Sequence, residues 1–139
     1  MADTLTLEII TPEKAAYSAP VEMVILPGVE GELGILPRHI PLVTEIKSGD
    51  LVITKDGKQE YLAVGEGFVE VTGDRCVVLT SMALEESEID EDAAAKAIER
   101  AQKAMEEKLT DEDQAAYQAE LLRSMAMLNL KRRRRGAKA

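Results

Sequence analysis

Apolar and polar residues alternate in short runs over the first 85 residues of the chain. Residues 4–11 place Leu5, Leu7 and Ile9 on one face, and this period of two predicts a half-buried strand. Further apolar runs occupy residues 21–26, 42–46, 51–54, 61–64, 68–71 and 76–80. No helical period lies between these runs, so the pattern predicts an antiparallel sandwich or barrel and not a parallel α/β sheet.

Two stretches between the strands carry strong turn signals. Asp56-Gly57 is typical of a two-residue β-hairpin. Residues 25–43 hold three glycines and three prolines, which predicts tight turns between short strands. Seven apolar residues of this stretch are expected to contribute to the β core: Ile25, Leu26, Leu33, Ile35, Leu36, Leu42 and Val43. Its polar residues are expected to lie on the turns and to point outward: Glu30, Glu32, Arg38 and His39.

The hydrophobic period becomes that of a helix after about Leu84. Asp90 is a good N-cap, and apolar residues recur at helical spacing over residues 94–105. Thr110 followed by Asp113 resembles a capping box and opens a second helix. The short connection between the two helices predicts an antiparallel helical hairpin.

The chain is therefore predicted to be α+β, with an N-terminal antiparallel β-sandwich at residues 1–85. A C-terminal antiparallel α-helical hairpin with a basic tail follows at residues 86–139. The first helix presents mostly alanine, so we expect the hairpin to be held loosely. The second is apolar on more than one face over residues 121–130. A single partner helix covers only a narrow stripe, so the remaining apolar surface of the second helix would contact the sandwich, another subunit or each in turn. The alternative is that both apolar faces pack on the sandwich alone.

Charge is distributed unevenly along the chain. The formal net charge is −9, yet residues 131–139 carry six Lys and Arg and no acidic residue. An acidic body with few aromatic residues argues against nucleic-acid binding. The run Lys131-Arg132-Arg133-Arg134-Arg135 is open to three interpretations: a solvated tail, a nucleic-acid contact, or a docking segment for an acidic protein surface.

Little in the sequence favours catalysis or a cofactor. His39 is the only histidine and Cys76 the only cysteine, which argues against a zinc site and excludes an internal disulfide. The glycines of residues 28–34 precede no Gly-Lys-Ser/Thr and do not form a P-loop. We find no apolar run long enough to span a bilayer and expect no signal peptide at the N-terminus.

Residues 31–42 read Gly-Glu-Leu-Gly-Ile-Leu-Pro-Arg-His-Ile-Pro-Leu, and this stretch resembles the signature of the epsilon subunit of bacterial F-type ATP synthases. The order of elements, the length and the Ile89-Asp90 step extend the resemblance over the chain. It implies a non-catalytic rotor subunit without a cofactor, in a synthase that couples proton or sodium flow to ATP synthesis. The location implied is the cytoplasmic face of the bacterial inner membrane, peripheral and through the complex alone.

The resemblance also implies partners. The sandwich would bind the gamma subunit and sit on the ring of c subunits, with Glu32 approaching the c ring and His39 near the gamma-facing side. The hairpin would extend along the central shaft, meet the catalytic alpha and beta subunits, and inhibit ATP hydrolysis. This favours protein docking over nucleic acid for the basic run. The remaining subunit-contact candidates are Arg123, Lys131, Arg132, Arg133, Arg134 and Arg135.

One departure concerns nucleotide binding. Some relatives bind ATP at the hairpin through an Ile/Leu-Asp-x-x-Arg-Ala motif, but Ala93 stands here in place of the arginine. Asp90 and Arg123 are the ATP candidates that are left, so we expect weak or undetectable ATP binding. Two alternative functions stay open at this point: a stand-alone ligand-binding sandwich and a nucleic-acid module that uses the tail.

Overall fold

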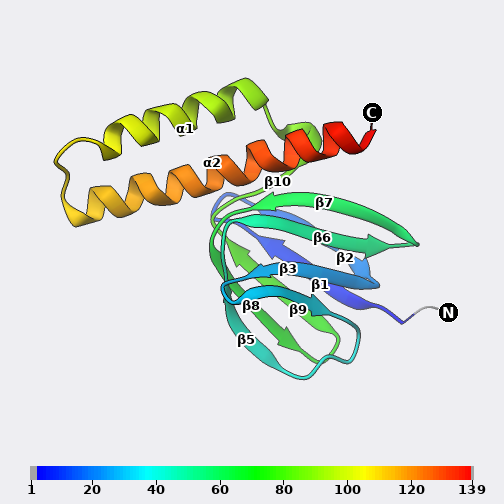
Figure 1. Cartoon of the computed structure of the whole chain (residues 1–139). Coiled ribbons are helices and arrows are strands. Elements are labelled where there is room, and N and C mark those ends of the chain that lie inside the picture. Colours follow the sequence, from blue (N-terminus) through cyan, green and yellow to red (C-terminus); the bar gives the residue numbers. More distant parts are fainter. Residues whose placement is uncertain (1–2, 139) are drawn as a thin grey trace.

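The computed structural model describes residues 3–138 of the chain, with side chains for residues 3–136. The N-terminal part is built entirely of strands, and the predicted order of a β part followed by two helices is confirmed (Figure 1). The strands are β1 (Leu5–Ile10), β2 (Ala15–Val21), β3 (Met23–Gly28), β4 (Gly31–Ile35), β5 (Leu42–Ile46), β6 (Gly49–Lys55), β7 (Lys58–Val64), β8 (Gly67–Thr72), β9 (Arg75–Thr80) and β10 (Ala83–Glu85).

The ten strands are hydrogen-bonded in the order β10-β7-β6-β3-β5-β8-β9-β1-β2, with β4 paired to β3 off this path. A single pair, Gly28 with Ile46, joins β3 to β5. The sheet therefore folds into two layers, β10-β7-β6-β3-β4 and β5-β8-β9-β1-β2, which face each other as a sandwich (Figure 1). At the β6–β7 turn, Asp56 and Gly57 both have positive φ, at 52° and 75°, as a type I′ hairpin requires.

The core follows from the alternation in the sequence. Leu5, Leu7 and Ile9 on β1 are all buried, and the residues between them are exposed or half-buried. On β8, Val69 and Val71 face inward in the same way. Because side chains along a strand point to opposite faces, each strand covers one side of a shared apolar core.

Three details differ from the prediction. Strand β2 was not predicted, because it has few large apolar residues and contains Pro20. The proline is tolerated because β2 pairs only with β1 at the end of the sheet. Strands β1 and β9 pair in parallel, although the sheet was expected to be antiparallel throughout. Glu32 lies within β4 and not on a turn, although its side chain is exposed as expected.

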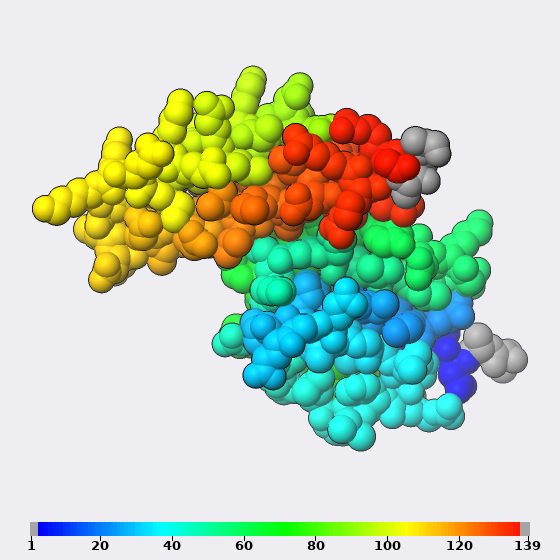
Figure 2. All heavy atoms as spheres, in the orientation of Figure 1, coloured from blue at the N-terminus to red at the C-terminus, as the bar shows by residue number. Residues whose placement is uncertain are grey.

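The helical part begins with a short 3₁₀ turn, η1 (Glu86–Glu88), followed by α1 (Glu91–Met105) and α2 (Asp111–Lys138). Both predicted starts are confirmed, because the Ala93 N–H donates to the Asp90 carboxylate and the Asp113 N–H donates to the Thr110 hydroxyl. The helices are antiparallel, and α2 lies between α1 and the sandwich (Figure 1). The turn of the hairpin projects beyond the edge of the sandwich (Figure 2).

Candidate functional site

The seat of α2 on the sandwich is a small apolar contact beside β7. Leu130 of α2, Ala63 of β7 and Ile89 before α1 are all nearly inaccessible to solvent. Met127 and Met82 pack against them and remain partly exposed. At about 25 cal/mol per Å2 of buried apolar surface, such a cluster stabilises the contact by only a few kcal/mol.

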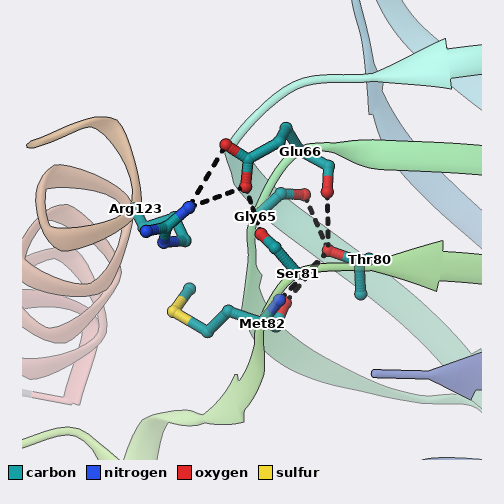
Figure 3. A network of polar contacts seen from close by, with 6 residues as sticks. All are labelled: Gly65, Glu66, Thr80, Ser81, Met82 and Arg123. Atoms are coloured by element: carbon teal, nitrogen blue, oxygen red, sulfur yellow. Dashed lines mark hydrogen bonds and ion pairs between the residues drawn. The ribbon is translucent and has the colours of Figure 1, made fainter. Parts of the chain in front are cut away.

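A polar network holds the middle of α2 against the sandwich (Figure 3). Arg123 Nη1 lies 3.0 Å from Glu66 Oε1, and the Ser81 hydroxyl donates to the same oxygen. Burial alone would raise the pKa of Glu66, but hydrogen bonds from Ser81 and Arg123 and the Arg123 charge outweigh it, so the pKa is lowered. The residue before Glu66 is Gly65, and a Cβ there would lie 2.1 Å from Ser81 Oγ and 3.1 Å from Arg123 Cδ. Glycine is therefore what lets α2 approach this closely.

The basic run Lys131–Arg135 contacts the sandwich near the C-terminal end of α2. Arg133 Nη2 lies 2.5 Å from Asp50 Oδ2 on β6. Burial raises the pKa of Asp50, and the charge and hydrogen bond of Arg133 oppose that rise. Arg134 lies over the ring of Tyr61 on β7, 4.2 Å from its centroid, as a cation–π contact. Thus two neighbouring arginines bind two neighbouring strands.

The rest of the run holds the hairpin together. Arg132 Nε lies 3.1 Å from Glu91 Oε1, and Arg135 Nη1 lies 2.5 Å from Glu91 Oε2. Glu91 is the first residue of α1, so one carboxylate of α1 receives two arginines of α2. These hydrogen bonds lower the pKa of Glu91. Lys131 donates to the Glu86 carbonyl in η1, 3.1 Å away.

The two ATP candidates are not brought together. Asp90 is used as the N-cap of α1, next to Glu91, at the level of Arg132 and Arg135. Arg123 precedes Arg132 by nine residues on α2, which is roughly 13 Å along the helix axis. Its guanidinium is already paired with Glu66. The arrangement therefore offers no joint arginine and aspartate cradle for a triphosphate.

Glu32 and His39 lie on different parts of the sandwich. Glu32 lines an open groove of about 430 Å3 between the β4 and β6 side of the sandwich and α2, where Asp50 and Arg133 also lie. His39 is half-buried, with its Nδ1 2.7 Å from the Ile40 carbonyl oxygen. The loop that holds it is fixed at Arg38, whose φ is 64° and whose N–H donates to Asp74.

An exposed apolar patch on the outer face of β5, β8 and β9 was not predicted from the sequence. Phe68 and Leu79 are cross-strand partners, and each is 52% exposed. Val43, on the neighbouring strand β5, was expected in the β core but is 71% exposed, because its side chain lies on the outer face of the strand. Ile40, before that strand, is 75% exposed. Phe68, Leu79 and Val43 occupy strand positions where the alternation calls for polar side chains, which is the signal that could have revealed them. Exposed large apolar residues gathered on one face of a sheet are typical of an interaction site.

Within residues 3–138, no group of three or more His, Cys, Asp or Glu side chains is arranged to hold a metal ion. No helix of that part of the chain is both long and apolar enough to cross a bilayer. Cys76 is buried in the β core, and burial raises the pKa of its thiol to about 11.

Comparison with family models matches both parts of the chain. Residues 4–86 match the β-sandwich domain of the ATP synthase delta/epsilon chain, and residues 87–131 match its long α-helix domain. The ATP synthase epsilon chain of Carboxydothermus hydrogenoformans is 47% identical over 103 residues, covering 74% of this chain and 77% of that one. The epsilon chain of Acidithiobacillus ferridurans is 38% identical over 135 residues, covering 97% and 96%.

Two solved structures share the fold. A chain of the mitochondrial ATP synthase of Euglena gracilis superposes with a TM-score of 0.73 at 23% identity, covering 89% of this chain and 79% of that one. A chain of the central stalk and c ring of the Tetrahymena thermophila mitochondrial ATP synthase gives a TM-score of 0.61 at 14% identity, covering 93% and 97%. At these identities the likeness concerns the fold.

Proposed function

The chain belongs to the ATP synthase delta/epsilon chain family and is a non-catalytic subunit of that synthase. From this we propose separate roles for its two parts. The sandwich binds the gamma subunit and rests on the c ring, and the hairpin regulates ATP hydrolysis. The predicted family is confirmed by these matches. The alternatives of a stand-alone ligand-binding or nucleic-acid module have no support among them.

The observation that carries the proposal is the apolar patch around Phe68 and Leu79. It lies on the layer of the sandwich opposite β7, on which α2 sits. Glu45 is the cross-strand partner of Phe68, and Glu70 that of Val43, so acidic side chains alternate with apolar ones across the patch. A partner that covers it needs an apolar surface with basic groups placed among the apolar ones. We assign this patch to gamma.

Glu32 is the proposed contact with the c ring. It is exposed on β4, and no salt bridge or side-chain hydrogen bond within the described residues engages it. A carboxylate in this setting is free to pair with a partner outside the chain. The synthase would then hold the subunit at the membrane surface on the cytoplasmic side, through these contacts alone.

The hairpin is the proposed regulatory element. Its apolar seat is small, and the α1 residues buried against α2 are Ala94 and Ala101, each of which contributes a single methyl group. A second resting place, extended beside gamma toward the catalytic alpha and beta subunits, is therefore within energetic reach. In that state the hairpin would obstruct rotation and inhibit hydrolysis.

The test of the patch is binding to the purified gamma subunit of the same synthase. Phe68→Asp and Leu79→Asp should each weaken binding by tenfold or more, since losing about 1.4 kcal/mol corresponds to a factor of ten. Leu122→Asp, at an exposed apolar residue of α2, is the matched control. Equal binding by all three variants, with unchanged folding, would rule out the patch as the gamma surface.

A further inference from the structure

Each of the five residues in the basic run already has a partner within the chain. Lys131 contacts η1, Arg133 contacts β6, Arg134 contacts β7, and Arg132 and Arg135 both contact α1. Successive residues of an α-helix point about 100° apart. Five consecutive cations therefore project around the helix, and the end of α2 reaches a different neighbour on each side.

The contacts fall into two sets with different effects. Arg133 with Asp50 and Arg134 with Tyr61 bind α2 to the sandwich. Arg132 and Arg135 with Glu91 bind α2 to α1. An extended hairpin has to break both sets, since α2 must leave the sandwich and must also separate from the start of α1.

The acceptors on the receiving side are well shielded. The side chains of Asp50 and Glu91 are only 20% and 24% exposed. The second oxygen of Asp50, Oδ1, is buried and has no hydrogen-bond partner among the described residues. Arg133 is the one cation paired with Asp50 in that part of the chain.

We propose that the run Lys131–Arg135 is a latch that closes the hairpin, and that an acidic protein surface opens it by competing for the same cations. This rests on the proposed role of the hairpin. The consequence is that the cations of the run stabilise both resting places. Neutralising Arg132–Arg135 therefore weakens the folded and the extended state together, and its effect on hydrolysis does not report on either state alone.

Changing the acceptors separates the two states. Asp50→Asn with Glu91→Gln removes the three ion pairs of the latch, those of Arg132, Arg133 and Arg135, but leaves every cation of the run in place for an outside partner. The matched control is Asp92→Asn with Glu99→Gln, which makes the same change in net charge. Asp92 lies in the first turn of α1 and has no salt bridge within the described residues, and Glu99 pairs with Lys103 inside α1.

The experiment measures hairpin opening in the isolated full chain. Spin labels are attached at Lys58→Cys on the sandwich and Lys108→Cys in the hairpin turn, with Cys76→Ala, and their distance distribution is recorded by pulsed electron resonance. At low salt, about 0.01 M, the latch variant should show an open fraction on the order of threefold to tenfold above that of the control. At about 1 M salt, the parent chain should move toward the latch variant.

An open fraction equal to that of the control at both salt concentrations overturns the latch. That result leaves the proposed function standing, because gamma binding and hydrolysis are measured separately. In the assembled synthase, the latch predicts that Asp50→Asn with Glu91→Gln lowers ATP hydrolysis, since the freed hairpin extends more often. Hydrolysis that rises in this variant as it does on hairpin deletion would also overturn it.

Discussion

Arg133 of α2 and Asp50 of β6 meet across the boundary between the hairpin and the sandwich, with 2.5 Å between Nη2 and Oδ2. The pair joins the most basic segment of the chain to the Asp50 carboxylate. Burial raises the pKa of Asp50, and the charge and hydrogen bond of Arg133 reduce that rise. Burying a lone carboxylate is costly, and Arg133 offsets part of that cost at this point. The position of the hairpin thus depends on residues in both parts of the chain.

Deleting residues 88–139 should leave the sandwich folded and able to bind gamma, because its core lies entirely within the strands. In the assembled synthase, ATP hydrolysis should rise if the hairpin inhibits it as proposed. Steady-state ATPase assays over a range of ATP to ADP ratios measure this. Normal assembly with unchanged hydrolysis at every ratio would show that the hairpin does not inhibit this synthase.

ATP binding by the isolated chain should be weak or undetectable. Ala93 cannot donate to phosphate through its side chain, and Arg123 is engaged by Glu66. Micromolar affinity requires about −8 kcal/mol, which charge-assisted contacts would have to supply. Isothermal titration calorimetry is the measurement. Heat consistent with a micromolar or tighter dissociation constant would contradict the prediction.

Glu32→Lys should weaken the coupling of rotation to proton or sodium flow while leaving the fold intact. The side chain is exposed on β4 and makes no salt bridge within the described residues. The free energy of unfolding of the isolated chain should therefore change by no more than about 0.5 kcal/mol. Proton or sodium pumping per ATP hydrolysed in membrane vesicles reports the coupling. A much larger loss of stability would make Glu32 a structural residue.

Gly65→Ala should lower the free energy of unfolding by about 1–3 kcal/mol, because the added Cβ would overlap Ser81 Oγ. Urea denaturation followed by circular dichroism measures this. Adding Ser81→Ala removes the atom that would lie 2.1 Å away, so the double variant should recover part of the loss. No recovery would place the strain elsewhere, for instance in the strand backbone.

Docking of the hairpin should weaken in acid. The pKa values of Glu66 and Glu91 are lowered from the usual 4.5, so both carboxylates stabilise the folded state above that pH. Their contribution is lost as the pH falls through their lowered values. Asp50 has the opposite sign, because its raised pKa makes protonation favourable in the folded state.

The spin-label distance between the sandwich and the hairpin turn, recorded from pH 7 down to pH 3, follows this loss. Glu66→Gln with Glu91→Gln should flatten the dependence below about pH 4.5. The reverse outcome, a parent chain that closes more firmly in acid, would show that Asp50 dominates.

The sequence alone was enough to predict the strands with a strong hydrophobic period and the helices with a local capping signal. The alternation of Leu5, Leu7 and Ile9 predicted β1, and the side chains of Asp90 and Thr110 cap the helices as expected. Strand β2 was missed because an edge strand with Pro20 and several small residues lacks the alternation of a buried one. Local pattern could not predict the parallel pairing of β1 with β9, because about 70 residues separate the two strands.

The candidate site depended more on tertiary contacts. The basic run was visible in the sequence, but its partners Asp50, Tyr61 and Glu91 are spread over three elements. Nothing in the local sequence marks these as acceptors. The patch at Phe68 and Leu79 was in principle visible, because both residues break the alternation of their strands.

Because α1 lies on the far side of α2 from the sandwich, the stability of α1 depends on α2. A helix of 15 residues is marginal in water without a neighbour, and α1 gains its support from α2 (Figure 1). When α2 departs, α1 either finds a new neighbour or melts. If α1 melts, the proposed extension is a local unfolding reaction and not a rigid swing, and the conformational entropy that α1 gains favours the open form.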